Sequence, residues 1–387
     1  MKAKMSHRER ALAALNHQEP DRVPVDLGQA AGDGITTIAY QNLLRHLGFG
    51  ERPLDVWNRE VQIVEVEEDV LRRFDVDFRA VRPGAPDRGG DTVLSPDSYR
   101  DQWGVVRVRP PGGFYFDFVA SPFAEDATLS AIERYPWPDP DDPGRYRGLR
   151  ERAKRLREET DYAVVLDADC TFFDNCGPLR GWENFYADLL VNTEFAKTLM
   201  DRYLEIKLAM AGHILEEAGA FADVVVASRD DLGTTTGPII SPALFRRLVL
   251  PRMKRIFDFF HARTEAKIFH HCDGAIYPLL GDLVEAGVQI TNPVQVNAAG
   301  MGDTARLKAE FGERLTFWGA IDTSAVLPRG TALEVRQEVE RRVRDLGPGG
   351  GYVLCSVHNI QPDVPPENVV AMFDAVHGVG TSGFGRS

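Results

Sequence analysis

Apolar runs of strand length alternate with segments of helical spacing over most of this chain. The expected strands cover residues 23–26, 74–81, 163–167, 223–227, 266–270, 288–292, 315–321 and 352–356. A helical segment follows each of them, as parallel strands require, because the chain must cross back over the sheet before the next strand begins. Eight such units can close into a barrel. The pattern therefore predicts an α/β fold of the (β/α)₈ TIM barrel class.

Helix-end signals support this order of elements. Thr331 and Glu334 have the spacing of a capping box. Pro251 lies inside another helical pattern and is expected to kink it, because proline removes a backbone hydrogen bond. We also expect a helix from residue 61 to residue 74 and an N-terminal helical extension at residues 6–16.

The pattern changes at about residues 91–123. Two alternating segments flank the turn Pro110-Pro-Gly-Gly113, in which proline presets and glycine permits unusual backbone angles. We expect a β-hairpin inserted into a single domain of residues 1–380, with a flexible tail at 381–387. Aromatic side chains of this insertion either line a pocket or pack together: Trp103, Phe114, Tyr115, Phe116 and Phe118.

Composition and charge narrow the functional classes. The formal net charge of the 387 residues is −13, which argues against a nucleic-acid surface, since such a surface needs basic side chains to neutralise phosphates. No apolar run approaches the ~20 residues that span a bilayer, and the first ten residues lack the apolar core of a secretion signal. We therefore expect a cytoplasmic protein without a membrane partner. Four scattered cysteines are too few for a disulfide framework: Cys170, Cys176, Cys272 and Cys355.

Polar side chains follow the apolar runs, where each expected strand ends. In a (β/α)₈ barrel these ends share one face, and that face carries the chemistry. Each of these residues taken singly could also be a helix cap, a loop residue or a buried hydrogen-bonding group. The set comprises Asp26, Asp167, Asp169, Asp230, Asp231, His270, His271, Cys272, Asn292, Asp322, His358 and Asn359.

The segment His270-His271-Cys272 is the most specific feature of this face. On an extended strand, His270 and Cys272 point to one side and His271 to the other. Zinc accepts imidazole nitrogen and thiolate sulfur, and three protein ligands with an open fourth position make a catalytic zinc site. His358, after the last strand, is the expected third ligand. The alternative is a core histidine and cysteine held by hydrogen bonds.

The remaining cysteines and glycines give weaker signals. Cys355 is expected to pack in the core, because free cysteine behaves as a small apolar residue. A redox role or a second metal site at Cys170 and Cys176 stays open, although their spacing is wide. Residues 349–351 are three glycines that precede a strand, whereas a phosphate-binding loop follows one.

Several motifs together resemble the uroporphyrinogen decarboxylase superfamily over nearly the whole chain. They are residues 6–16 with Asp21-Arg-Val-Pro-Val25, Asp230-Asp-Leu-Gly233, the His-x-Cys segment, Asn292-Pro-Val-Gln295, Phe317-Trp-Gly-Ala-Ile-Asp322 and His358-Asn-Ile-Gln-Pro-Asp-Val-Pro-Pro-Glu-Asn368. Within the superfamily the chain is most similar to corrinoid-dependent methyltransferases, which include coenzyme M methyltransferases and the first methyltransferase of aryl-ether O-demethylases. The resemblance implies a (β/α)₈ barrel.

The resemblance separates two chemistries. Decarboxylases of the superfamily hold porphyrinogen carboxylates with arginines after the first strand, whereas this chain has Leu27-Gly-Gln-Ala-Ala-Gly32 there. A polycarboxylate is therefore a poor expected substrate. Methyltransferases of the superfamily use His-x-Cys and a late cysteine as zinc ligands. His270 and Cys272 match that motif, and His358 stands at the late position.

The resemblance thus implies a zinc methyltransferase that passes a methyl group from a small methoxylated, aromatic compound to a Co(I) corrinoid. The cobalamin would arrive on a separate corrinoid protein that docks at the strand ends. We expect catalytic roles for Asp231 and Asp322, and substrate contacts from Asp26, Asn292, Gln295 and Phe172. Two alternatives remain: a metal-free decarboxylase or lyase in which Asp26, Asp231 or Asp322 handles protons, and a non-catalytic corrinoid-protein-binding subunit. The sequence also leaves open whether the protein forms a homodimer.

Overall fold

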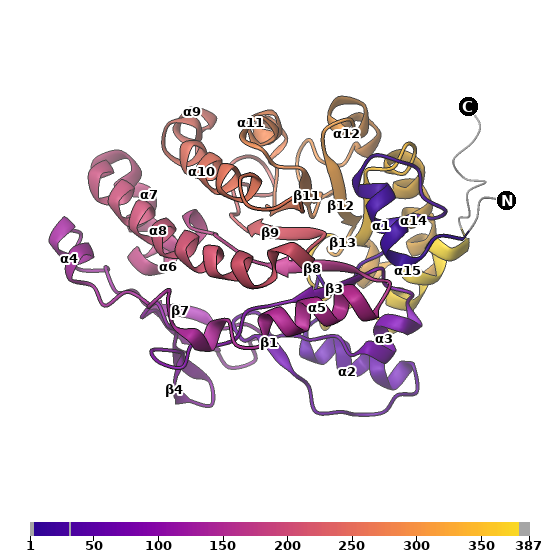
Figure 1. Cartoon of the computed structure of the whole chain (residues 1–387), viewed down its shortest axis with the longest axis horizontal. Coiled ribbons are helices and arrows are strands. Elements are labelled where there is room, and N and C mark those ends of the chain that lie inside the picture. Colours follow the sequence, from indigo (N-terminus) through magenta and orange to yellow (C-terminus); the bar gives the residue numbers. More distant parts are fainter. Residues whose placement is uncertain (1–3, 31, 379–387) are drawn as a thin grey trace.

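The computed structural model describes residues 4–30 and 32–378 and shows a curled parallel sheet surrounded by helices (Figure 1). Seven strands of the described chain form this sheet, and each lies beside the next one along the sequence. They are β3 (Phe78–Val81), β8 (Ala163–Asp167), β9 (Val224–Ser228), β10 (Lys267–His271), β11 (Ile290–Asn292), β12 (Thr316–Ile321) and β13 (Tyr352–Ser356). The tail predicted at residues 381–387 lies outside the described residues.

The segment predicted as the first strand closes this sheet into a barrel. Val25 forms a parallel bridge to Leu354 of β13. On its other side, the Val25 carbonyl accepts a hydrogen bond from the Asp77 N–H at 3.1 Å, directly before β3. Residues 23–26 therefore occupy the eighth position of the ring. The predicted (β/α)₈ barrel class is confirmed, with its first strand reduced to a bridge.

Large side chains from several strands fill the barrel interior. The ring of Trp318 on β12 lies 4.4 Å from that of Phe78 on β3 and 5.4 Å from that of Phe269 on β10, centroid to centroid. Phe269 therefore faces inward, whereas its neighbour Ile268 packs in the separate apolar layer between the sheet and the helices. Helix α1 (His7–Leu15), the predicted N-terminal extension, adds two side chains to the interior cluster.

Helices follow the strands and form the outer layer (Figure 1). The capping boxes of α1 and α14 are both formed, the second by Thr331 and Glu334 as predicted. The kink expected at Pro251 takes the form of a π-helical segment, Phe245–Val249, directly before α10. The other helices are α2 (Thr37–His46), α3 (Glu68–Arg73), α4 (Leu129–Arg134), α5 (Leu149–Glu159), α6 (Phe173–Arg180), α7 (Trp182–Val191), α8 (Thr193–Ala218), α9 (Pro242–Leu244), α10 (Leu250–His261), α11 (Leu280–Ala286), α12 (Thr304–Phe311), α13 (Val326–Arg329), α14 (Ala332–Leu346) and α15 (Pro366–Gly378), with short 3₁₀ turns at Pro143–Arg145, Gly219–Phe221 and Tyr277–Leu279. Within the described part of the chain, none of these helices has both the length and the apolar character needed to cross a membrane.

The insertion is larger than the predicted hairpin. Its four strands form an antiparallel sheet in the order β4 (Thr92–Ser95), β5 (Ser98–Arg100), β6 (Val106–Val108) and β7 (Asp117–Ala120). The predicted hairpin corresponds to the pairing of β6 with β7. In Figure 1 this sheet lies beside the barrel, near β1 and away from both chain termini.

The prediction of a helix from residue 61 to residue 74 is wrong for the first half of that segment. Ile63–Val64 forms strand β2, which pairs with β1 (Val56–Asn58), and Ile63 also bridges Thr36. Only α3, from Glu68 to Arg73, is helical. The spacing of the valines in this segment fits a helical period, but β-branched side chains fit an extended backbone at least as well.

Candidate functional site

Three ligand-capable side chains meet at the carboxyl ends of neighbouring strands. Asp231 follows β9, His271 is the last residue of β10, and Asp273 lies two residues later. One oxygen or nitrogen atom from each lies within 4.8 Å of the others. The His271 Nε2 atom is 3.8 Å from Asp231 Oδ1 and 3.6 Å from Asp273 Oδ2. His358, after β13, brings its Nε2 atom to 3.5 Å from Asp273 Oδ2.

The register predicted for β10 is wrong by one residue. Because Phe269 faces the barrel interior, His271 lies on the same side and His270 points outward toward the helices. The His270 ring is fully buried and lies 5.8 Å from that of Phe257 on α10. Burial lowers the pKa of His270 to about 3, so the ring is neutral, and neither of its nitrogens has a hydrogen-bond partner in the described chain.

Cys272 is also placed differently from the prediction. Its thiol is 1% exposed, accepts a hydrogen bond from the Leu232 N–H at 3.2 Å and donates one to the Asp273 carbonyl at 3.6 Å. Burial raises the pKa of Cys272 well above its ordinary value, which keeps the sulfur protonated. Among the described residues, the predicted ligands His270, Cys272 and His358 do not form a common group of ligand atoms.

Opposite charges face one another in the observed cluster of Asp231, His271 and Asp273. Burial would lower the pKa of His271, but the carboxylates of Asp273 and Asp231 and the contact with Asn292 raise it to about 9. Burial would raise the pKa of Asp273, yet the two imidazoles of His271 and His358 hold it below its ordinary value. Burial and the charge of Asp273 raise the pKa of Asp231. The carboxylates of Asp231 and Asp273 therefore stabilise a positive charge between them, which is here the proton on His271.

Asn292 and Gly32 fix the orientation of His271. The Asn292 Oδ1 atom lies 2.5 Å from His271 Nδ1, and the Asn292 amide nitrogen donates to the Trp318 carbonyl at 3.0 Å. This assignment places the Nδ1 proton toward Asn292 and turns Nε2 toward the carboxylates. Gly32 has a φ of +100°, and a Cβ there would lie 2.2 Å from His271 Nδ1. Only glycine allows the loop after the first strand to approach so closely.

The other residues predicted to contact substrate or to act in catalysis shape the surrounding loops. The Asp26 carboxylate is 1% exposed and accepts hydrogen bonds from two N–H groups of its own turn. The Asp322 carboxylate accepts bonds from the backbone and hydroxyl of Ser324. Gln295 Oε1 accepts the Gly274 N–H at 2.7 Å and so holds the loop that carries Asp273. Phe172 is fully buried in the outer apolar layer.

Two acidic residues near the site were given no role by the sequence reasoning. Asp273 ends the polar stretch that follows the expected strand at residues 266–270, and the His271-x-Asp273 spacing places both side chains on one side of an extended chain. Asp174 lies at the start of α6 and interacts electrostatically with Asp231 of the cluster. Burial and the charges of Asp231 and Asp230 raise the pKa of Asp174 well above the ordinary range. No local motif indicates Asp174, since α6 brings it to the site from a different strand–helix unit.

The inserted sheet reaches the same end of the barrel. The Tyr115 hydroxyl and the Gln361 side-chain amide are hydrogen-bonded, and Gln361 lies three residues after His358. The Phe116 N–H donates to the Glu60 carbonyl at 2.9 Å. The insertion thus lies against the loop that carries His358 and covers part of the barrel mouth.

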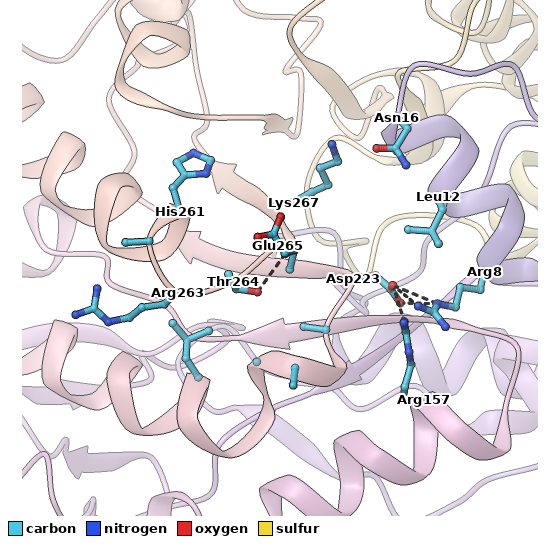
Figure 2. Close-up of a pocket in the computed structure, with 16 residues that line it drawn as sticks. Arg8, Leu12, Asn16, Arg157, Asp223, His261, Arg263, Thr264, Glu265 and Lys267 are labelled. Carbon is cyan, nitrogen blue, oxygen red and sulfur yellow. Dashed lines mark hydrogen bonds and ion pairs between the residues drawn. The ribbon is translucent and has the colours of Figure 1, made fainter.

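A second cavity of the described chain lies at the opposite end of the barrel (Figure 2). It measures about 910 Å³ and is lined by Lys267, the first residue of β10, and by Asp223, which directly precedes β9. Figure 2 shows Asp223 held between Arg8 and Arg157, at 3.0 and 2.8 Å. Because the amino ends of the strands form this cavity, it is separate from the cluster at their carboxyl ends.

Comparisons with known proteins agree with the fold. The family model for uroporphyrinogen decarboxylase matches residues 118–379. A uroporphyrinogen decarboxylase of Alkalilimnicola ehrlichii is 25% identical over 95% of this chain and 93% of its own length. One from Idiomarina loihiensis is 22% identical over 95% of both chains. The structure of a methyltransferase from Methanosarcina mazei superposes with a TM-score of 0.63 at 16% identity, over 97% of this chain and 99% of that one.

Proposed function

This chain belongs to the uroporphyrinogen decarboxylase family, and we propose that it is a zinc-dependent methyltransferase of that family. It would move a methyl group from a small methoxylated, aromatic compound to the Co(I) corrinoid of a separate protein. The observation that carries the proposal is the convergence of Asp231, His271 and Asp273, with His358 beside them, at the carboxyl ends of the barrel strands. The likeness in fold to a methyltransferase is consistent with it.

The cluster has the chemistry of a zinc site. Zinc binds imidazole nitrogen and carboxylate oxygen, and catalytic sites leave one position open. The Asp273 Oδ1 atom is buried and has no hydrogen-bond partner in the described chain. Asn292 orients His271 as outer partners orient metal-bound imidazoles. We therefore propose Asp231, His271 and Asp273 as ligands, in place of the pair His270 and Cys272. A nitrogen and oxygen donor set also suits other first-row divalent ions, so elemental analysis identifies the metal.

The side chains of the site have separable tasks in this reaction. Zinc held there would stabilise the charge that develops on the ether oxygen as the methyl group leaves. The ether oxygen would keep the electron pair of the broken carbon–oxygen bond, and the methyl group would pass to the partner's corrinoid, whose Co(I) would supply the electron pair of the new bond. His358, whose side chain is 36% exposed, is placed to give the departing oxygen a proton. The hydrogen bond between Tyr115 and Gln361 holds the inserted sheet against the loop that carries His358.

Purified protein loaded with zinc tests this proposal directly. We expect at least one aryl methyl ether in a panel, incubated with a reduced corrinoid protein, to give a methylated corrinoid and an equal amount of the free phenol. The corrinoid is followed by its visible spectrum and the phenol by mass spectrometry. Protein treated with a chelator should be inactive and should recover when zinc is restored. Failure of the whole panel with zinc-loaded protein would contradict methyl transfer.

Zinc affinity should depend steeply on pH. Zinc needs the neutral imidazole of His271, but in the metal-free protein the pKa of this group is raised to about 9. One proton must therefore leave for each ion bound, and the affinity should rise about tenfold per pH unit between about pH 6 and pH 8. Competition with a zinc-sensitive dye at several pH values measures the slope. A pH-independent affinity would contradict His271 as a ligand.

A metal-free decarboxylase is the second candidate. The curated relatives named above are uroporphyrinogen decarboxylases, and a buried imidazole between Asp231 and Asp273 can hold a proton for a carbanion. Elemental analysis separates the two functions. Stoichiometric zinc that disappears with His271→Ala favours methyl transfer, whereas metal-free protein that releases CO₂ favours decarboxylation.

A further inference from the structure

A small cavity of about 180 Å³ lies at the carboxyl ends of β8 and β9. The inserted sheet contributes Trp103 to its wall, α8 contributes Lys207, and the loop after β9 contributes Arg229. Arg145, from the 3₁₀ turn before α5, completes the basic part of the lining. None of these residues belongs to the cluster around His271.

Arg145 is a buried cation that forms no close ion pair in the described chain. It is 7% exposed, and no carboxylate of the described chain lies within ion-pair distance of its guanidinium. Its Nε atom donates to the Asp139 carbonyl at 3.3 Å and one terminal nitrogen donates to Gln102 Oε1 at 2.7 Å. A guanidinium has five N–H groups, so most of its donors remain available. Burial lowers the pKa of Arg145, and the charges of Tyr146, Asp142 and Asp139, which act in the opposite direction, do not offset it.

The other charges of the cavity cancel in pairs. Lys207 lies 3.1 Å from Asp169, and Arg229 lies 2.6 Å from Asp167. The lining therefore carries three positive and two negative side chains, and the excess charge belongs to Arg145. The Nε atom of Arg229 is also buried without a hydrogen-bond partner in the described part of the chain. Leaving such donors and such a charge uncompensated is costly, and an anion with acceptor oxygens would satisfy both.

We propose that this cavity binds the carboxylate of a small organic acid. One negative charge matches the single excess positive charge, and the two oxygens of a carboxylate match a guanidinium in geometry. The rest of the lining suits an apolar body, because Trp103, Tyr146, Met210 and Ile214 form it. Inorganic phosphate fits less well, since it carries more than one charge at neutral pH and has no apolar part. The site is independent of the proposed methyl transfer.

Titration of the full-length protein with benzoate tests the proposal. We expect saturable binding by calorimetry together with a change in tryptophan fluorescence, because Trp103 lines the cavity. Arg145→Gln should weaken binding at least about tenfold, which corresponds to ~1.4 kcal/mol. Arg147→Gln is the matched control. Arg147 lies two residues away, is exposed and pairs with Asp87 at 2.6 Å, so its removal should leave benzoate binding unchanged.

Further variants and ligands keep the test decisive. If Arg145→Gln does not fold, Lys207→Gln takes its place: it leaves the Asp169 carboxylate in the lining without its lysine partner, and this negative charge should weaken benzoate binding. His271→Ala and chelator-treated protein should bind benzoate as the wild type does, because the cavity does not share the zinc site. Phosphate should compete only at much higher concentration. Absence of saturable benzoate binding, equal binding by folded Arg145→Gln, or phosphate binding as tight as that of benzoate would each overturn the proposal.

Discussion

His271→Ala is expected to abolish stoichiometric zinc and to reduce methyl transfer by more than about 100-fold, since loss of a supporting outer residue alone often costs about 10- to 100-fold in affinity or activity. The imidazole supplies the nitrogen that Asp231 and Asp273 surround, at 3.8 and 3.6 Å. Without it, two carboxylates face each other with no cation between them. Zinc content by mass spectrometry and turnover with an accepted aryl methyl ether measure the two effects on one preparation.

His270→Ala is the matched control, because it removes the same side chain from the adjacent position. The His270 ring faces α10 and has no polar partner in the described chain. Its loss opens a cavity but also removes two buried polar atoms, so the two effects on stability oppose each other. Zinc should stay bound. If His270→Ala loses zinc and His271→Ala keeps it, His270 is the ligand and the proposed role of His271 is wrong.

Strands buried on both sides could be placed well from the sequence. The predicted strands at residues 163–167 and 352–356 coincide with β8 and β13. The same property hides the register, because a run such as Ile268-Phe269 is apolar on both faces and does not indicate which face is inside. Only the contact between Phe269 and Trp318 across the barrel decides it. For this reason the sequence assigned the metal-binding histidine to His270, whereas the structure places His271 in the cluster.

The remaining site residues depend on contacts between distant segments. Gly32 belongs to the segment Leu27–Gly32 after the first expected strand, but its packing on His271 could not be foreseen from the sequence. Likewise, Val25 was expected in a full strand. Its N–H instead donates to the Asp77 side chain at 2.8 Å, so a carboxylate replaces the neighbouring strand's carbonyl and the ladder ends after one bridge.

Asp77→Asn is expected to destabilise the protein by about 3–5 kcal/mol, the usual cost of breaking a buried ion pair. Asp77 is fully buried at the point where the barrel closes, and its carboxylate accepts hydrogen bonds from Arg10 and Arg22 at 2.7 Å each. Asparagine keeps one acceptor oxygen but not the charge, so two nearly buried guanidinium groups lose their shared counterion. The midpoint of urea unfolding, followed by circular dichroism, measures the loss.

Asp374→Asn provides the comparison for an exposed pair. Asp374 lies 3.2 Å from Arg73, both side chains are 41% exposed, and water replaces the lost contact. Its cost should be within about 1 kcal/mol. Equal destabilisation by Asp77→Asn and Asp374→Asn would show that burial does not matter at the closure point.

A double variant separates the penalty of unpaired charge from the loss of hydrogen bonds. Arg22→Met added to Asp77→Asn removes one of the two cations that lose the Asp77 charge, while the second partner of Arg22, Asp75, is 41% exposed and stays hydrated. If the loss of this buried counterion dominates, the double variant should be more stable than Asp77→Asn alone, because it removes a buried cation that has lost part of its compensating charge. If the lost hydrogen bonds dominate, Arg22→Met should destabilise the protein further than Asp77→Asn alone. The sign of this coupling energy therefore decides whether electrostatics or hydrogen-bond geometry holds the first segment in the barrel.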